Sequence, residues 1–455
     1  MEPTEKESLN EPTAEGSSTT DTSAMPKDPS KDFSPENAKK MQELFAKMMK
    51  DNPETYKKFE EFKQMQPLLQ PHAFWDTQPV QKVTETMGIS EITPGPIEEN
   101  KKNDISTEPI KLAEGFEWCK IDIHNEEQAK ELHELLNKHY VESDGGTFKL
   151  DYPLDFLKWA LCPPGYKPKW HIGVRATKTK KLCAFIAGIP LNLTIMGEEV
   201  KASSINFLCI HQKLRSKRLA PVLIKEVTRR INRTDVWQAI YTSATLIPKP
   251  FSDAVYYGRP LNYKKLVEVN FFKKDKSFNA KKKLYTLPDE TETPGFRRIR
   301  KKEIKKVYPM LKEFLSEYKV AINFSPEEAV HYLNYRENVV YSYVVEDPET
   351  KEITDFISFY SLNSEVIGHD KHDTMNAAYC WYYCSTKTPL ESLIKDATIM
   401  AKKEGFDIFQ MLNIMENEEV VDELRFAKLK GTLHYYLFNY RLPNINPEDI
   451  GVSFV

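Results

Sequence analysis

The residues with the clearest chemical potential lie between Lys213 and Arg233. This stretch holds eight basic side chains and one acidic one, Glu226. The basic residues crowd into a short turn between an apolar run, 205–210, and a helical pattern that begins near Pro221. Such a turn is an anion site, because the free N–H groups and the dipole of a helix N-terminus add to the side-chain charge. It predicts a pyrophosphate site, with a solvated basic helix face as the alternative.

The apolar run before that turn offers a second kind of chemistry. If Asn206-Phe207-Leu208-Cys209 breaks regular strand pairing, its amides face the same cavity as the basic turn. Backbone N–H groups held in that way can stabilise the negative charge that develops on a thioester oxygen during acyl transfer. A plain core strand is the alternative interpretation.

Cysteines and histidines form no metal-binding pattern. The ten histidines contain no HExxH pair, and the six cysteines (119, 162, 183, 209, 380 and 384) contain no CxxC pair. Cys380 and Cys384 fall in an aromatic run that predicts a buried strand, where two ligands would lack partners. We expect reduced thiols and no metal.

Charge and composition restrict the function classes further. The chain carries 64 Lys+Arg against 67 Asp+Glu, a net charge of −3, which disfavours a nucleic-acid coat. A nucleic-acid or anionic-membrane binder that uses 213–233 and 297–306 stays a rival hypothesis. No apolar run approaches the roughly 18 residues of a spanning helix. The first residues lack the basic and apolar regions of a signal peptide, so we expect a cytoplasmic protein.

The elements that must position these residues follow from periodicity. Residues 1–31 are too polar to bury a core and predict a disordered acidic tail, followed by short helices to about Gln64. Pro71–Val80 predicts an extended segment. The expected strands are 117–123, 170–175, 181–190, 204–211, 339–346, 355–362, 377–385 and 406–413, and the expected helices are 127–139, 221–232, 304–319 and 390–404. The similar order of elements in two successive halves predicts an α+β fold with an internal duplication.

The apolar run 205–210 and the basic turn after it carry a family resemblance. Ile205-Asn206-Phe207-Leu208-Cys209-Ile210-His211, with Leu214-Arg215-Ser216-Lys217-Arg218-Leu219-Ala220-Pro221, closely resembles the first signature of the N-myristoyltransferase family. Further segments fall in the family's order: 74–75, 77–80, 95–97, 116–118, 140–142, 170–175, 259–262, 341–346 and 436–441. The resemblance covers about residues 71–455.

The resemblance implies an acyltransferase that moves the myristoyl group from myristoyl-CoA to the amine of an N-terminal glycine by direct attack on the thioester. It implies two tandem GNAT-like halves, related by pseudo-two-fold symmetry, that form one composite saddle-shaped sheet. We expect residues 1–70 to form the tail and its helices, 71–290 to bind myristoyl-CoA, and 291–455 to bind peptide and supply the C-terminal carboxylate. Proteins with an N-terminal glycine are the expected partners, and ribosomes a further one through the tail.

The resemblance also assigns residues to the acyl-CoA. It places the adenine and 3′-phosphate end near His72, Ala73, Phe74 and Trp75, and it makes Cys209 a further residue of the acyl-CoA site. It places the pyrophosphate on the turn formed by Arg215, Ser216, Lys217, Arg218, Leu219, Ala220 and Pro221. Myristoyl-CoA is the co-substrate, and no prosthetic group is expected.

For the reaction itself, the resemblance places the thioester carbonyl on the amides of Phe207 and Leu208 and makes the carboxylate of Val455 the base. A carboxylate can take a proton from an ammonium group when its surroundings bring the two pKa values together. The apolar run 450–455 predicts that this terminus tucks inside. Asn206 and Thr242 are candidates to orient the amine. The candidates for the peptide entrance are Tyr140, Val141, Glu142, Phe148, Tyr256 and Gly431.

The sequence departs from the family's pattern at four places. Ser204 replaces a glutamate, Gly258 replaces a histidine, and a further segment ends Ser243-Ala244. The second signature, Lys-Phe-Gly-x-Gly-Asp-Gly in the family, is Arg425-Phe426-Ala427-Lys428-Leu429-Lys430-Gly431, so that a lysine stands where the family has an acidic residue facing a basic peptide. A cation at this place would repel a lysine-bearing substrate. An alternative hypothesis is therefore a non-catalytic or altered-specificity paralogue that binds acyl-CoA or acyl-peptide.

Overall fold

The fold is described here from a computed structural model, which covers residues 68, 71–82, 85, 92–100, 102–141 and 146–455. All of these belong to one compact unit that begins at Leu68. The expected acidic tail and the helices before residue 65 lie outside the described residues. None of the helices in the described ranges has the length and apolarity that crossing a membrane demands.

The first half of the described chain alternates strands and helices, as expected. Its elements are β1 (Phe116–Lys120), α4 (Glu126–His139), β2 (Phe148–Leu150), α5 (Leu154–Leu161), β3 (His171–Ala176), β4 (Leu182–Ile195), β5 (Glu198–Ile210), α6 (Leu219–Asn232), β6 (Gln238–Ser243), β7 (Ser252–Pro260), α7 (Tyr263–Glu268) and α8 (Phe278–Leu284). Short 3-10 turns add to these, among them η3 (Trp75–Thr77) and η6 (Gln212–Lys217).

The second half repeats the alternation. Its elements are β8 (Phe296–Arg298), α9 (Ile304–Ser316), β9 (Val320–Ile322), α10 (Pro326–Leu333), β10 (Val340–Glu346), β11 (Ile353–Ser361), β12 (Ser364–Val366), β13 (Thr374–Met375), β14 (Ala377–Cys384), α11 (Leu390–Lys403), β15 (Ile408–Leu412), β16 (Ala427–Phe438) and β17 (Ile450–Gly451). The expected strands and helices are present, with ends that shift by a few residues.

One large mixed sheet joins the two halves, and its strand order is mirrored about its centre. The order is β1-β3-β4-β5-β6-β16-β7-β15-β14-β11-β10-β8. In the first half, α6 connects the parallel neighbours β5 and β6, and in the second half α11 connects the parallel neighbours β14 and β15. These two strand–helix–strand units occupy equivalent places on either side of the centre, which supports the expected duplication.

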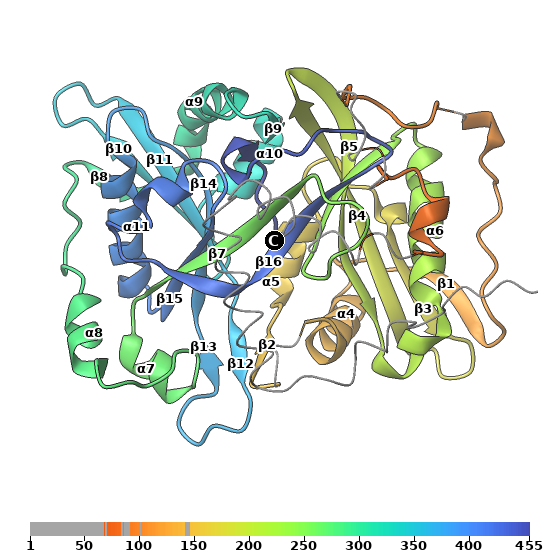
Figure 1. The fold of residues 1–455 in the computed structure, drawn as a ribbon, viewed down its shortest axis with the longest axis horizontal. Helices are drawn as coiled ribbons and strands as arrows, with labels where there is room; N and C mark the ends of the chain where they lie inside the picture. The colour runs from red at the N-terminus through yellow and green to blue at the C-terminus, as the bar shows by residue number, and fades with distance from the viewer. Residues whose placement is uncertain (1–67, 69–70, 83–84, 86–91, 101, 142–145) are drawn as a thin grey trace, which may run out of the picture. The chain divides into compact units, whose positions relative to one another are not determined.

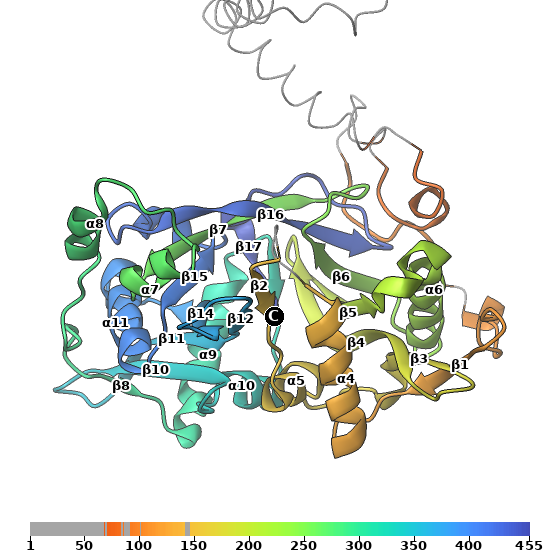
Figure 2. The ribbon, with the colours of Figure 1, turned by 90° about the horizontal axis from the view of Figure 1, so that it is seen from below.

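The two central strands are exchanged between the halves. β7 follows β6 in the chain but pairs with β15, while β16 follows β15 but pairs with β6. β7 and β16 also pair with each other, and Figure 1 shows them running side by side across the middle of the fold. The C-terminus lies near this centre in both ribbon views (Figures 1 and 2). The exchange therefore brings the end of the chain between its two halves.

Helix α6 is held to the first half by one apolar face. Leu223, Val227 and Ile231 recur at four-residue steps, are buried, and pack on Ile172 and Ile186 of β3 and β4. This is the spacing of a helix that buries one stripe against a sheet. Because the stripe fixes the helix, the position of its N-terminus relative to the end of β5 is fixed as well.

The segment Pro71–Val80 corrects one expectation. It was expected to be extended, but its middle forms the 3-10 turn η3. Asp76 accepts a hydrogen bond from the His72 amide, and the Thr77 hydroxyl donates to the Phe74 carbonyl. Such local side-chain bonds stabilise a turn, which the flanking prolines did not indicate.

The seam between β7 and β16 contains an unusually close contact. A Cβ atom on Gly258 of β7 would lie 2.9 Å from Ile408 Cδ1 and 3.0 Å from Leu429 Cδ1. The side chain of Leu429 therefore occupies the space that any side chain at position 258 would need. A glycine on one strand and a leucine on the other complement each other across the seam.

This contact predicts a coupled stability effect. Gly258→Ala should lower the free energy of unfolding by about 1–3 kcal/mol, because the new methyl group overpacks the seam. Leu429→Ala should also destabilise the protein, but the double variant should lose less than the sum of the two, since removing Leu429 makes room for the methyl group. Urea unfolding of the four proteins measures this coupling, and strictly additive losses would contradict the packing.

Candidate active site

The strand before the basic turn breaks its pairing, as the sequence suggested it could. In the β4–β5 ladder, Phe185 pairs with Cys209 and Ala187 pairs with Asn206, so two residues, Phe207 and Leu208, stand opposite one. Phe207 has φ +55°, in the left-handed region that side chains rarely adopt. A bulge of this kind leaves backbone groups outside the ladder and is common beside active sites. The sequence-based condition for an oxyanion site is thus met.

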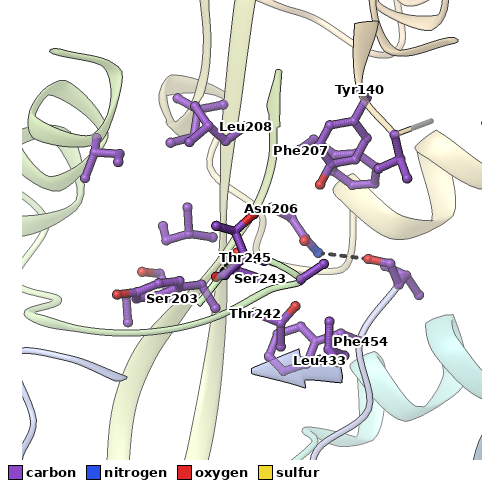
Figure 3. A pocket seen from close by; sticks show the side chains of 18 of the residues that line it. Tyr140, Ser203, Asn206, Phe207, Leu208, Thr242, Ser243, Thr245, Leu433 and Phe454 are labelled. Atoms are coloured by element: carbon purple, nitrogen blue, oxygen red, sulfur yellow. Dashed lines mark hydrogen bonds between the residues drawn. The ribbon is translucent and has the colours of Figure 1, made fainter. Parts of the chain in front are cut away.

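The bulge opens on a cavity of about 800 Å³, which we call the central cavity. Its size is that of a typical ligand pocket. One part of its wall is apolar and is built by Ile186, Leu208, Ile224, Val227, Ile231 and Phe438. The other part is more polar and includes Asn206, Thr242, Ser243, Tyr256, Gln410 and Lys430. Figure 3 shows Phe207, Asn206 and Thr242 around this space.

The end of the chain lies in the same cavity. Val455 lines it, and the preceding Phe454 is only 9% exposed. The Asn206 side-chain amide donates a hydrogen bond to a main-chain oxygen of Val455, 3.4 Å away, drawn as the dashed line in Figure 3. Because Asn206 directly precedes the bulge, this bond joins the end of the chain to the residue next to the bulge. The expected burial of the C-terminus is confirmed.

Three tyrosines, which we call the terminal tyrosines, hold the last residues. Tyr360 Oη donates to the Phe454 carbonyl and Tyr435 Oη to the Val452 carbonyl, each at 3.0 Å. Tyr382 Oη accepts a hydrogen bond from the Ser453 amide at 3.0 Å. Burial raises the pKa of all three hydroxyls well above the ordinary tyrosine value, so they remain neutral at physiological pH. The terminus is therefore bound at three successive residues.

Sequence reasoning missed the terminal tyrosines. Tyr360 and Tyr382 lie in expected strands, of which the one that holds Tyr382 was expected to be buried, and a buried tyrosine needs a partner for its hydroxyl. That need was visible in the sequence. The partner was not, because it lies 94 residues away for Tyr360 and 71 residues away for Tyr382.

The residues expected at the peptide entrance divide into two groups. Tyr140, Val141 and Tyr256 line the central cavity, as does Thr242. Burial raises the pKa of Tyr140 to about 12, and its ring lies 5.7 Å from that of Phe207.

The structure does not bring Phe148 or Gly431 to the cavity wall. The Phe148 ring packs on Phe271, with the ring centres 5.7 Å apart. Gly431 does not line the cavity either, although its neighbour Lys430 does. Glu142 lies outside the described residues.

The expected adenine segment reaches the cavity through one side chain. Trp75 lines the cavity and stacks on Tyr241 with the ring centroids 5.9 Å apart. The Lys82 ammonium donates to the Trp75 carbonyl and fixes the turn. His72, Ala73 and Phe74 precede Trp75 and are not part of the cavity wall.

The basic turn begins as the 3-10 turn η6 and ends where α6 begins. Arg218 adopts a left-handed conformation, with φ +55°, and directly precedes α6. Leu219, Ala220 and Pro221 form the first turn of the helix, while Ser216, Lys217 and Arg218 are exposed. None of the residues from Arg215 to Pro221 lines the cavity, but residues further along α6 do. The basic turn therefore lies at the end of α6, and the cavity lies along the side of the same helix.

Positive charge is concentrated at this turn. The Arg215 guanidinium donates to the carbonyls of Ile210 and His139, which ties it to β5 and to α4. The rings of His139 and His211 lie 4.1 Å apart. Burial, together with the charges of His211 and Arg215, lowers the pKa of His139. The Cys209 thiol donates a hydrogen bond to the Leu135 carbonyl.

Two of the departures from the family's pattern are neighbours in space. Gly258 lacks a side chain where Leu429 inserts one, so the two changes fill one volume. The altered second signature is part of strand β16 and contains a register shift between Lys428 and Thr432. Ser204 is buried in β5.

Known proteins resemble the chain over most of its length. Residues 96–254 match the family model described as Myristoyl-CoA:protein N-myristoyltransferase, N-terminal domain, and residues 267–452 match the C-terminal domain of the same description. Glycylpeptide N-tetradecanoyltransferase 1 of Arabidopsis thaliana is 44% identical over 385 residues, which cover 84% of this chain and 88% of that protein. Glycylpeptide N-tetradecanoyltransferase 2 of Danio rerio is 45% identical, with coverage of 84% and 77%.

A solved structure also resembles this chain in its fold. The crystal structure of Saccharomyces cerevisiae N-myristoyltransferase with bound myristoyl-CoA has a TM-score of 0.81 and 38% identity, and the match covers 85% of this chain and 100% of that one.

The terminal tyrosines predict how firmly the C-terminus is held. Replacing Tyr360, Tyr382 and Tyr435 by phenylalanine should weaken the docking of the last residues by about 0.5–1.5 kcal/mol per lost hydrogen bond. Carboxypeptidase should then release Val455 faster than from the unmodified protein. Tyr257→Phe is the matched control, because its hydroxyl donates to Glu418 and not to the terminus. Equal release rates in all proteins would contradict the proposed anchoring.

Proposed function

The chain belongs to the myristoyl-CoA:protein N-myristoyltransferase family, and we infer that it transfers the myristoyl group of myristoyl-CoA to the α-amine of an N-terminal glycine in proteins. The thioester C–S bond breaks, an amide C–N bond forms, and CoA leaves as the thiol. One observation of this structure carries the mechanism: the carboxylate of Val455 lies in the same cavity as the Phe207–Leu208 bulge.

The bulge amides are proposed to stabilise the thioester oxygen. Attack by the amine moves negative charge onto this oxygen, and preorganised N–H donors lower the energy of that state without reorganising. The bulge supplies such donors because Phe207 and Leu208 stand opposite a single residue of β4. The direct transfer needs no covalent acyl-enzyme, because both substrates meet in one cavity.

The Val455 carboxylate is proposed to accept the proton that the glycine ammonium must lose before it attacks. Asn206 holds one oxygen of this carboxylate through its amide. Asn206 was expected to orient the amine. Its contact with Val455 supports a role in orienting the base instead. Thr242, on the polar side of the same cavity, remains the candidate to orient the amine.

The acyl-CoA is proposed to lie along α6. The apolar wall, which includes Ile224, Val227 and Ile231 of this helix, would take the myristoyl chain. The basic turn at the helix N-terminus, residues 215–221, would take the pyrophosphate, since free amides, the helix dipole and exposed cations act together there. The segment 72–75, which reaches the cavity through Trp75, would take the adenine end.

The peptide is proposed to enter along the polar wall, past Tyr140, Val141 and Tyr256, with Glu142, Phe148 and Gly431 beside the path. We propose residues 71–290 as the acyl-CoA-binding half and 291–455 as the half that binds much of the peptide and supplies the carboxylate. A cytoplasmic location and a ribosome contact through residues 1–31 stay predictions.

Blocking the terminus tests the role of Val455. Deleting Val455, or appending a short tag after it, should abolish CoA release from myristoyl-CoA and a glycine-initiated peptide, because the base is lost or displaced. Affinity for myristoyl-CoA should change little, since the basic turn and the apolar wall are intact. The same tag at the N-terminus is the control. Full turnover in the C-terminally tagged protein would refute the mechanism.

Neutralising the basic turn tests the anion site. The triple variant Arg215→Gln, Lys217→Gln, Arg218→Gln should weaken myristoyl-CoA binding by at least about tenfold, through lost charge-assisted contacts to the pyrophosphate. Calorimetric titration measures it. Lys225→Gln, an exposed charge in the middle of α6, should leave the affinity near its original value. Unchanged affinity in the triple variant would place the pyrophosphate elsewhere.

A further inference from the structure

Lys430 is a charged residue in the wall of the central cavity. Among the described residues that line the central cavity, it is the only one with a charged side chain. The other charge in the cavity is the carboxylate of Val455. A substrate that reaches Val455 therefore occupies the same space as this ammonium group.

The strand presents Lys430 in a bulge. Lys428 pairs with Tyr257 and Thr432 pairs with Val255, so three residues of β16, 429–431, stand opposite the single residue Tyr256. Gly431 has φ +96°, a conformation that suits glycine and lets the strand return to its register. Tyr256 itself lines the cavity. The extra residues of β16 therefore lie at the cavity wall.

Packing fixes this bulge in place. Leu429, directly before Lys430, fills the space left by Gly258, at the contact distances given above. The backbone of Lys430 is held on one side by the Leu429 side chain, which packs on the neighbouring strand, and on the other by the regular pair Thr432–Val255. Lys430 is thus carried by a defined strand element.

The charge of Lys430 has no acidic partner in the part of the chain that the structure describes. Two acidic groups on adjoining elements, Glu418 and Asp253, are engaged elsewhere. Glu418 accepts hydrogen bonds from Tyr257 and Asn413, and Asp253 is paired with His434. Lys430 is also exposed, so a ligand can reach it.

We propose that Lys430 selects substrates that carry an acidic side chain within the first few residues after the N-terminal glycine. This inference rests on the proposed function, because it places the glycine amine at Val455. An extended peptide advances about 3.3–3.6 Å per residue, so its next residues run along the cavity wall where Lys430 lies. A carboxylate there is attracted, and a lysine is repelled.

Competition between peptides tests this selection. Short glycine-initiated peptides that differ only in carrying Glu, Gln or Lys at one later position are assayed for kcat/KM, one position at a time. At one or more positions the original protein should prefer Glu to Lys by about 1.5- to fivefold, the range expected for an exposed charge pair. The preference should shrink at high salt.

Charge reversal is the decisive variant. Lys430→Glu should invert the preference at the same position, and Lys430→Met should remove it. Lys428→Glu is the matched control, since Lys428 is an exposed lysine two residues earlier on β16 that does not line the cavity. It should retain the preference of the original protein. The variants' thermal unfolding should match, which shows that the bulge is intact.

Three results would overturn the inference. One is a preference that Lys430→Glu leaves unchanged. Another is a change in the KM for myristoyl-CoA alone, which would place Lys430 on the acyl-CoA. The third is an equal effect of Lys428→Glu, which would indicate a general surface charge. Absence of turnover with every peptide would instead refute the proposed function, so the two failures are distinguishable.

Discussion

The structure depends on holding the end of the chain inside the fold. A free terminus normally frays, because ordering it costs conformational entropy and its charge prefers water. Here the terminal tyrosines bind the main chain at residues 452, 453 and 454 in turn, and Asn206 binds the last residue. These contacts place a carboxylate in the central cavity, which both apolar and polar residues line. The reaction we infer takes place in this cavity.

The strand exchange explains how one chain can bring these parts together. β7 leaves the first half to pair with β15, and β16 returns to pair with β6. Each half therefore completes the sheet of the other, and residues from both converge on the cavity. The bulge comes from the first half, while the terminus and the terminal tyrosines come from the second. A simple tandem arrangement without exchange would not enclose the terminus between the halves.

Local sequence patterns predict several elements of the fold and of the candidate site. The helix α6, the basic turn before it and the strand β5 follow from periodicity and charge within a short window, and the resemblance added the family. The bulge at Phe207 could be stated only as a condition, because a left-handed φ depends on how β4 pairs with β5. The anchors Tyr360 and Tyr382 and the contact of Gly258 with Leu429 join residues 71 to 171 positions apart in the chain. Such pairs become visible only when strands are placed in register.

A terminal carboxylate differs physically from a side-chain base. An aspartate or glutamate carboxylate hangs on rotatable side-chain bonds, and its position must be fixed by packing around them. The carboxylate of Val455 is attached directly to the backbone, so bonds to main-chain atoms of 452–454 position the base itself. Tyrosine hydroxyls suit this task, because burial keeps them neutral and they add no charge beside the carboxylate. Lys430, the one cationic side chain among the described residues that line the cavity, is proposed to act on the side chains of the substrate. The base itself is positioned by hydrogen bonds.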